Sequence, residues 1–155
     1  KPAGYTPVDI VDRGQIFKAG IDIDLNSYQT DLARTIPNQS LDLVSVFIGF
    51  HHCPVDQREA FISSIRDAMS HNAMLVLRDH DAHNQKMRRM AALAHDVFNA
   101  GTHETWQTNQ EELRNFYSLA QLEQMMIQFG FKPLGKKLYQ PGDPTLNALM
   151  AFQKA

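Results

Sequence analysis

The run Leu41-Asp42-Leu43-Val44-Ser45-Val46-Phe47-Ile48 decides how this chain is organised. It is largely apolar and rich in β-branched residues, which is typical of a strand inside a parallel sheet that is covered on both faces. The turn-forming segment Thr35-Ile36-Pro37-Asn38-Gln39-Ser40 precedes it, and the polar loop Gly49-Phe50-His51-His52-Cys53-Pro54 follows it. We therefore predict a buried strand whose carboxyl end leads into a loop with two histidines and a cysteine.

Helix and strand patterns alternate after this loop. Apolar residues at helical spacing predict a helix over about residues 54–69, with Asp56 and Glu59 in capping-box positions at its start. The apolar run Ala73–Leu77 predicts a second buried strand that leads into Arg78-Asp79-His80-Asp81-Ala82-His83. A further helix, ended by Gly101, has a predicted inner stripe of Met87, Met90, Ala91, Ala94, Val97 and Phe98.

The last third of the chain carries one clear helix signal and one hairpin signal. The polar stretch 102–115 contains the only tryptophan, Trp106, and a short helical pattern around residues 110–113. Ser118-Leu119-Ala120-Gln121 is a capping box that opens a helix through Phe129, which Gly130 ends. Strands over 132–139 and 147–153 flank a turn, so we expect an antiparallel hairpin.

The order of these elements predicts the fold class. Val8–Val11 and Gly20–Leu25 alternate apolar and polar residues and are read as two further strands. Together the segments predict one α/β domain over residues 1–155, with a Rossmann-like, mostly parallel sheet, helices on both faces and a C-terminal antiparallel hairpin. In such sheets ligands bind outside the carboxyl ends of the strands, so function is to be sought there.

Composition excludes several kinds of partner. The 155 residues hold 15 Lys and Arg against 17 Asp and Glu, a net charge of −2, so no electrostatic footprint points to nucleic acid or to an anionic membrane. No apolar run approaches the roughly 20 residues that span a bilayer. The single cysteine, Cys53, cannot form an internal disulfide, which favours a reducing compartment such as the cytoplasm. We expect a small-molecule substrate and leave a homo-oligomer open.

Several of these segments, taken in order, resemble the C-terminal part of the class I S-adenosylmethionine-dependent methyltransferases. Ile36-Pro37-Asn38-Gln39-Ser40-Leu41-Asp42-Leu43-Val44 looks like the segment that enters the fourth strand in the small-molecule branch of that family. His51-His52-Cys53-Pro54 is similar to the paired histidines and proline that often follow this strand. The Gly130-Phe131 break and the final hairpin also fit, so the resemblance covers roughly residues 20 to 155.

The resemblance implies S-adenosylmethionine as cofactor and assigns residues to it. Phe47, Ile48 and Gly49 would line the methionine side of the cofactor. Asp12 would take the place of the acidic residue that binds the ribose hydroxyls, and Asp24 or Tyr28 would lie near the adenine. The implied function is methyl transfer to a small-molecule acceptor.

One family motif has no counterpart in this chain. The glycine-rich loop that follows the family's first strand is missing, because none of the eight glycines forms a G-x-G pair. We therefore expect the chain to be the C-terminal portion of a larger enzyme, with the cofactor site completed upstream of Lys1. On its own the chain could then be inactive.

The histidines are the candidate catalytic groups. Methyl transfer needs a general base only where the acceptor is protonated, and His51, His52 and His80 are candidates for that base. Asp79 is a candidate for orienting such a base, while Arg78 and Asp81 would orient a polar substrate. Trp106 would cover the substrate pocket. The competing interpretation is that these histidines only pack or cap, and that Arg78 forms an ion pair while Asp81 caps the next helix.

Two further functions stay open at this stage. A divalent metal site, for Zn²⁺ or Fe²⁺, could be built from His51, His52, Cys53, Asp79, His80, Asp81 and His83, although their spacing matches no standard motif. A methyltransferase-like module that serves assembly or dimerisation without catalysis is the other alternative.

Overall fold

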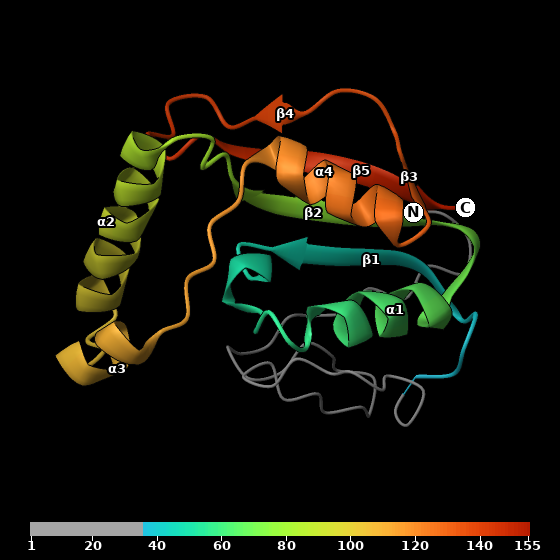
Figure 1. Ribbon diagram of the computed structural model, residues 1–155, viewed down its shortest axis with the longest axis horizontal. Coiled ribbons are helices and arrows are strands. Elements are labelled where there is room, and N and C mark those ends of the chain that lie inside the picture. Colours follow the sequence, from blue (N-terminus) through green and yellow to red (C-terminus); the bar gives the residue numbers. More distant parts are fainter. Residues whose placement is uncertain (1–35) are drawn as a thin grey trace, which may run out of the picture.

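The computed structural model describes residues 36–155, so the two strands predicted at Val8–Val11 and Gly20–Leu25 lie outside the described residues. In chain order the elements are β1 (Leu41–Phe47), the 3-10 helix η2 (Phe50–His52), α1 (Arg58–Ala68), β2 (Met69–His80), α2 (Gln85–Gly101), α3 (Trp106–Glu111), α4 (Leu119–Gln128), β3 (Phe131–Pro133), β4 (Leu138–Tyr139) and β5 (Asn147–Lys154). Figure 1 shows them on the chain.

The described strands form one mixed sheet, in the order β1-β2-β5-β3, with β4 also paired to β5. β1 and β2 are parallel, and β5 is antiparallel to β2, β3 and β4. This arrangement confirms the predicted α/β, Rossmann-like fold class with its C-terminal antiparallel hairpin. The strand predicted over residues 132–139 is divided into β3 and β4.

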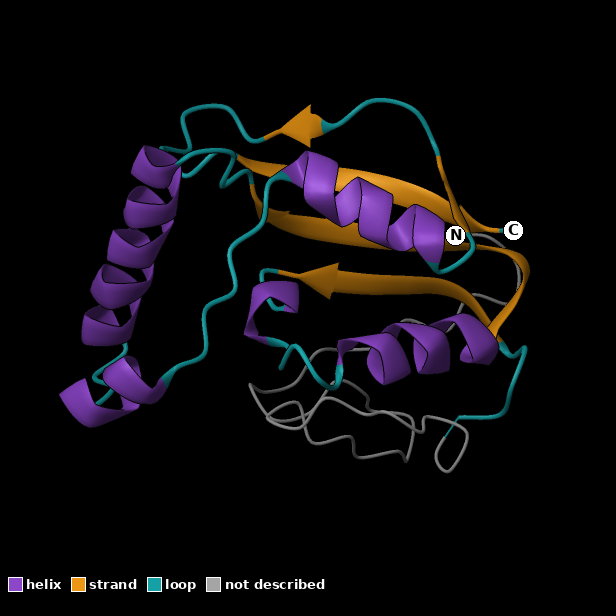
Figure 2. Cartoon of the chain, viewed as in Figure 1, coloured by secondary structure: helices purple, strands orange, loops and turns teal. Residues whose placement is uncertain are grey.

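The hydrophobic core lies where α1 and α4 pack on the sheet. Figure 2 shows these two helices beside the strands, with α2 and α3 beyond the end of the sheet. Alternate residues of β2 face this core, so Leu75 is 2% exposed and its neighbour Met74 is 41% exposed. The core also contains Ile62, Ile65, Leu77, Leu119, Leu122, Met126, Phe131, Met150 and Phe152.

The predicted capping box at the start of α4 is confirmed. The Ser118 side chain accepts from the backbone N–H of Gln121, and the Gln121 side chain accepts from the backbone N–H of Ser118. Gly130 follows the helix with a φ of +79°, a conformation that glycine adopts without the penalty a Cβ would bring. Both ends of this helix are therefore determined by local sequence.

The capping box predicted for the first helix is wrong. α1 begins at Arg58 rather than near Pro54, and its N-cap residue, Gln57, makes no side-chain capping bond. The backbone N–H of Gln57 donates to the carbonyl of Pro54 at 3.1 Å, so a turn occupies the residues that were expected to open the helix. Asp56 and Glu59 thus do not cap α1.

The helix α2 is confirmed, but its predicted inner stripe is confirmed only in part: Ala91 is buried, while Val97 and Phe98 are wrong. Its buried residues are Ala91, His95 and Asn99, whereas Val97 is 64% exposed and Phe98 is 53% exposed. α2 lies at the carboxyl end of β1 and β2 instead of against the core (Figure 1). Its inner face therefore meets polar groups.

Two boundaries differ in ways that matter for the site. β2 continues through Arg78, Asp79 and His80, which were expected to follow the strand. The short helix predicted around residues 110–113 lies earlier in the chain, as α3 over Trp106–Glu111, so the prediction is correct only for its first two residues. Among the helices of residues 36–155, none combines the length and the apolar character needed to cross a membrane.

Candidate functional site

Four histidines from three elements meet at the carboxyl end of β1 and β2. His51 and His52 belong to η2, His80 is the last residue of β2, and His95 lies in the middle of α2. The His51 ring centroid is 4.1 Å from that of His52, 5.4 Å from that of His80 and 4.8 Å from that of His95. The Phe116 ring packs against three of them, at 5.1 Å from His51.

The backbone between β1 and η2 delivers His51 to this position. Ile48 has a φ of +51°, an unusual conformation for a β-branched residue, and its N–H donates to the carbonyl of Arg78 at 2.8 Å. The chain then turns through Gly49 into η2, so that His51 becomes fully buried.

His51 is held by the carboxylate of Asp79. The His51 Nδ1 lies 2.7 Å from Asp79 Oδ1, which also accepts from the backbone N–H of His80 at 2.8 Å. Asp79 is 3% exposed, so the pair is shielded from water. Because a carboxylate accepts, the His51 proton lies on Nδ1. The other ring nitrogen, Nε2, is buried and has no hydrogen-bond partner among residues 36–155.

His80 is held from the opposite side of the cluster. Its Nδ1 lies 2.9 Å from Thr145 Oγ1, and the Thr145 hydroxyl donates to Asp143 at 2.7 Å. Since that hydroxyl has a single proton, Thr145 accepts from His80, whose proton therefore lies on Nδ1. Burial, the main cause, lowers the pKa of His80 to about 4.

His95 faces both His80 and a carboxylate. Its Nε2 lies 3.3 Å from the Nε2 of His80, and its Nδ1 lies 3.6 Å from Oε2 of Glu112. Burial first, and then the neighbouring His51 and His52, lower the pKa of His95 to about 4. The ring is therefore neutral at pH 7.

His52 is the most accessible member of the group. Its side chain is 23% exposed, and its Nδ1 donates to the carbonyl of Leu113 at 2.7 Å, which leaves the lone pair on Nε2. That nitrogen lies 3.6 Å from Oε1 of Glu112. Burial and the neighbouring His51 lower the pKa of His52.

The Glu112 carboxylate is oriented by hydrogen bonds from Asn99 of α2 and from Arg114. Arg114 donates to its Oε2 through Nε at 2.9 Å, and Asn99 donates to the same oxygen at 3.0 Å. Arg114 also bonds Asp96 at 2.8 Å. Burial alone would raise the pKa of Glu112, but the bonds from Arg114 and Asn99 outweigh it, so the pKa is lowered. Glu112 is therefore ionised at pH 7.

The structure brings together the four residues predicted to be catalytic: His51, His52, Asp79 and His80. It gives the residues predicted to bind substrate other contacts. Arg78 bonds the side chain of Gln140. Asp81 accepts from the backbone N–H of Leu119 at 3.1 Å and from the Tyr139 hydroxyl at 2.9 Å. Trp106, at the start of α3, is 66% exposed.

Asp81 is not the cap of the next helix. Asn84 caps α2 instead, because its side chain accepts from the N–H of Met87. The four ionisable residues after Leu77 are thus divided between the histidine cluster and the hairpin.

The residues assigned to the cofactor are only partly described. Asp12, Asp24 and Tyr28 lie outside residues 36–155. Phe47 is 51% exposed at the end of β1, and Ile48 and Gly49 follow it. Among residues 36–155, a Cβ added at Gly49 would meet only the carbonyl of Phe47, at 3.7 Å, so these residues leave open space beside this backbone.

Sequence reasoning missed His95, Phe116, Glu112 and Thr145. Ala91, His95 and Asn99 recur every four residues, which was a signal for one shared helix face. Larger apolar residues of the same helix, such as Val97 and Phe98, indicated a different buried face. Phe116, Glu112 and Thr145 lie in connecting segments without periodicity, so no pattern marked them.

The seven-residue metal set considered from the sequence does not assemble as one group. The Cys53 thiol is directed to the carbonyl of Pro54 at 3.6 Å, and burial raises its pKa to about 11. Asp81 and His83 contact each other at 3.7 Å instead of joining the cluster. The sets whose ligand atoms lie within 4.8 Å of one another are His51, His80 and His95, and His52, His95 and Glu112.

Comparison with known proteins links this fold to one group of enzymes. No protein-family model matches the chain, and no curated protein matches it. A SAM-dependent methyltransferase from Thermotoga maritima, described as a possible histamine N-methyltransferase, superposes with a TM-score of 0.53 at 14% identity, over 77% of this chain and 59% of that one. The chain therefore spans less than two thirds of that structure's length.

Two further structures agree with the first. The CurJ carbon methyltransferase has a TM-score of 0.57 at 13% identity, over 87% of this chain and 34% of that one. The 1,6-didemethyltoxoflavin-N1-methyltransferase of Burkholderia thailandensis, solved with S-adenosylhomocysteine, has a TM-score of 0.53 at 10% identity, over 80% of this chain and 48% of that one. The chain has the fold of S-adenosylmethionine-dependent methyltransferases.

Proposed function

We propose that this chain binds S-adenosylmethionine and takes part in methyl transfer from it to a small-molecule acceptor. The observation that carries the proposal is the position of the histidine cluster. It lies at the carboxyl end of β1 and β2, where open α/β sheets bind their ligands. Solved methyltransferases share this fold.

The end of β1 fits the cofactor that the fold implies. Half of the Phe47 side chain is exposed there, which offers apolar surface to the methionine part of S-adenosylmethionine. The space beside Gly49 allows a ligand to approach the backbone closely. S-adenosylmethionine supplies a methyl group that is already activated by its sulfonium. Phe47, Ile48 and Gly49 would hold it, together with residues outside the described part of the chain, where Asp12, Asp24 and Tyr28 are candidates.

His52 is the member of the cluster best suited to accept a proton from the acceptor. Its Nε2 carries the lone pair, and its side chain is 23% exposed, whereas His51 is 0% and His80 is 5% exposed. A general base must reach the proton that it removes, so the accessible ring is favoured over the buried ones. Asp79 then acts indirectly, because it orients His51, whose ring packs against His52.

Calorimetric titration with S-adenosylhomocysteine tests cofactor binding. We expect the chain, or any longer natural chain that contains it, to bind, and Phe47→Asp to weaken binding at least about tenfold. Leu138→Asp is the matched control, since Leu138 is an equally apolar residue that is 64% exposed on β4, and it should leave binding unchanged. Absence of binding by both chains would refute the cofactor proposal and favour the non-catalytic module.

Release of S-adenosylhomocysteine tests the reaction itself. The acceptors are a panel of small alcohols, phenols, amines and carbon acids. For an accepted substrate, His52→Gln should lower kcat by about 10²- to 10⁴-fold. His71→Gln is the control, because His71 is an exposed residue of β2 away from the strand's carboxyl end. Equal rates for His52→Gln and the wild type would remove the assigned base.

A further inference from the structure

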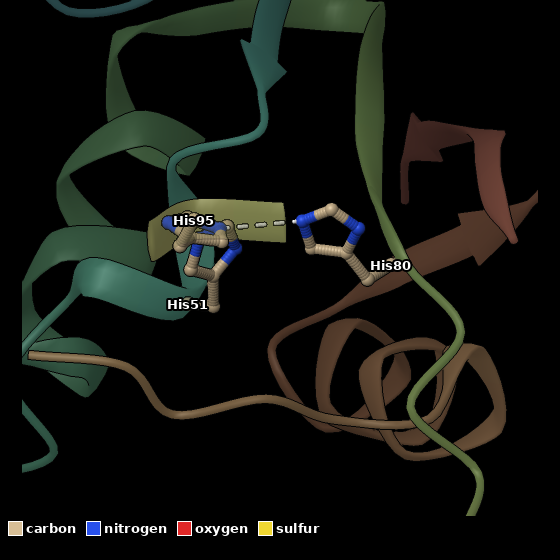
Figure 3. Close-up of side chains that lie close together, drawn as sticks. All are labelled: His51, His80 and His95. Carbon is tan, nitrogen blue, oxygen red and sulfur yellow. Dashed lines mark hydrogen bonds between the residues drawn. The ribbon is translucent and has the colours of Figure 1, made fainter. Parts of the chain in front are cut away.

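His51, His80 and His95 converge on one buried point. One ring nitrogen from each lies within 4.8 Å of the others. Figure 3 shows the three rings together, with His80 facing His95. The residues are 0%, 5% and 7% exposed, so little water reaches the space between them.

Each of the three rings has an outward partner for its Nδ1. Asp79 lies at 2.7 Å from Nδ1 of His51, and Thr145 lies at 2.9 Å from Nδ1 of His80. Glu112 lies at 3.6 Å from Nδ1 of His95, beyond hydrogen-bond distance, so this contact does not fix the position of the His95 proton. The bonds to Asp79 and Thr145 direct the Nδ1 protons of His51 and His80 outward and leave lone pairs on the Nε2 atoms of these two rings.

Without an ion, the centre of the cluster holds at most one donor. The Nε2 atoms of His80 and His95 face each other at 3.3 Å, so a hydrogen bond between them needs the His95 proton on Nε2. Nε2 of His51 is buried and has no partner among the described residues. A buried nitrogen without a partner is unfavourable, and a cation between the rings would satisfy it.

The geometry matches a divalent transition-metal ion. Zinc binds imidazole nitrogen at about 2.0–2.1 Å in a tetrahedral site, which separates two such nitrogens by about 3.3 Å. The separation between His80 and His95 is 3.3 Å. One nitrogen of His51 lies within 4.8 Å of the other two ligand atoms, so its ring must move closer to complete the set. Metal-binding histidines also commonly donate their second nitrogen to a carboxylate, carbonyl or hydroxyl group, as His51 donates to Asp79 and His80 to Thr145 here.

We propose that His51, His80 and His95 bind one divalent first-row metal ion, with zinc as the preferred ion. Three imidazoles suit zinc, and they leave a fourth position open for water or for an acceptor oxygen. The binding is independent of methyl transfer. Only the further role, in which the ion holds and acidifies a hydroxyl acceptor, rests on the proposed function.

The direct test is titration of ZnCl₂ into a chain without a histidine tag, freed of metal with a chelator and then of the chelator. We expect one ion per chain. Co²⁺ in its place should give the intense visible absorption of a tetrahedral site. His95→Gln should weaken zinc binding by more than about 100-fold, and Glu112→Gln should weaken it by about 10- to 100-fold. His71→Gln is the control and should bind as the wild type does.

Three outcomes would overturn the proposal. The first is absence of stoichiometric metal binding by the folded wild type, which means that an extra proton fills the cluster. The second is unchanged binding by His95→Gln with a native circular dichroism spectrum. The third is loss of binding in His52→Gln but not in His51→Gln, which transfers the site to His52, His95 and Glu112. If His95→Gln does not fold, the Co²⁺ spectrum of the wild type still shows whether the chain contains a tetrahedral metal site. These metal-binding results can be interpreted even if the chain does not bind S-adenosylmethionine.

Discussion

Asp79→Ala should destabilise the chain strongly, because it removes the acceptor shared by two buried donors. The bond from His51 to the carboxylate is worth about 1.5–3 kcal/mol, and the backbone N–H of His80, left unpaired, costs about 1–3 kcal/mol. Relief from burying a carboxylate offsets part of this, which leaves a net loss of about 2–5 kcal/mol. At a urea m-value of about 2 kcal/mol per molar, the unfolding midpoint falls by about 1–2.5 M.

The assay is urea unfolding followed by far-ultraviolet circular dichroism at pH 7.5, with a chelator present so that metal binding does not contribute. Asp79→Asn keeps an acceptor oxygen and should lose only about 1–1.5 kcal/mol, the difference between a charged and a neutral hydrogen bond. Asp67→Ala is the control, since Asp67 is 57% exposed and 3.6 Å from Arg66, and it should cost under about 1 kcal/mol. Equal effects of Asp79→Ala and Asp67→Ala would refute the reasoning.

Three further predictions concern the packing, the caps and the pH dependence. Phe152→Ala should cost about 3–5 kcal/mol in urea unfolding, since Phe152 is 1% exposed, against less than about 0.5 kcal/mol for Leu138→Ala. Ser118→Ala should cost about 1 kcal/mol in thermal unfolding, because it removes the α4 capping box. Burial alone would raise the pKa of Asp143, but hydrogen bonds led by those from Thr145 lower it overall. Asp143 therefore stabilises the fold above about pH 4 and loses this contribution as the pH falls through its lowered pKa, so the stability gap to Asp143→Asn should close in acid. A gap independent of pH would contradict this.

The parts of the fold that are encoded locally could be predicted from the sequence. The strand at β1 and the Ser118 to Gln121 capping box depend on neighbouring residues alone, and both are confirmed. The predicted burial of β1 is wrong for the described part of the chain, because no residue of this strand is buried and Leu43 is 56% exposed. The end of β2 could not be predicted in this way. Its apolar run stops at Leu77, because Asp79 and His80 are buried against other polar groups instead of apolar ones.

The candidate site was predictable only in part, for a related reason. His51 and Asp79 follow two adjacent parallel strands, whose carboxyl ends meet, so their proximity follows from topology. His95 enters from α2, and its position depends on where that helix lies beyond the sheet. Hydrophobic periodicity carries no information on this placement, since the inner face of α2 is lined by Ala91, His95 and Asn99.

The turn at Ile48 couples the pairing of β1 with β2 to the position of the loop that carries His51. A β-branched residue with a φ of +51° costs about 1–2 kcal/mol, so local preference does not maintain this turn. The bond from its N–H to the carbonyl of Arg78 does, and it joins the start of the His51 loop to β2. Separation of β1 from β2 would therefore release the loop in the same step. Amide hydrogen exchange at Ile48 and His52, whose N–H groups bond Arg78 and Gly49, should then report one cooperative opening.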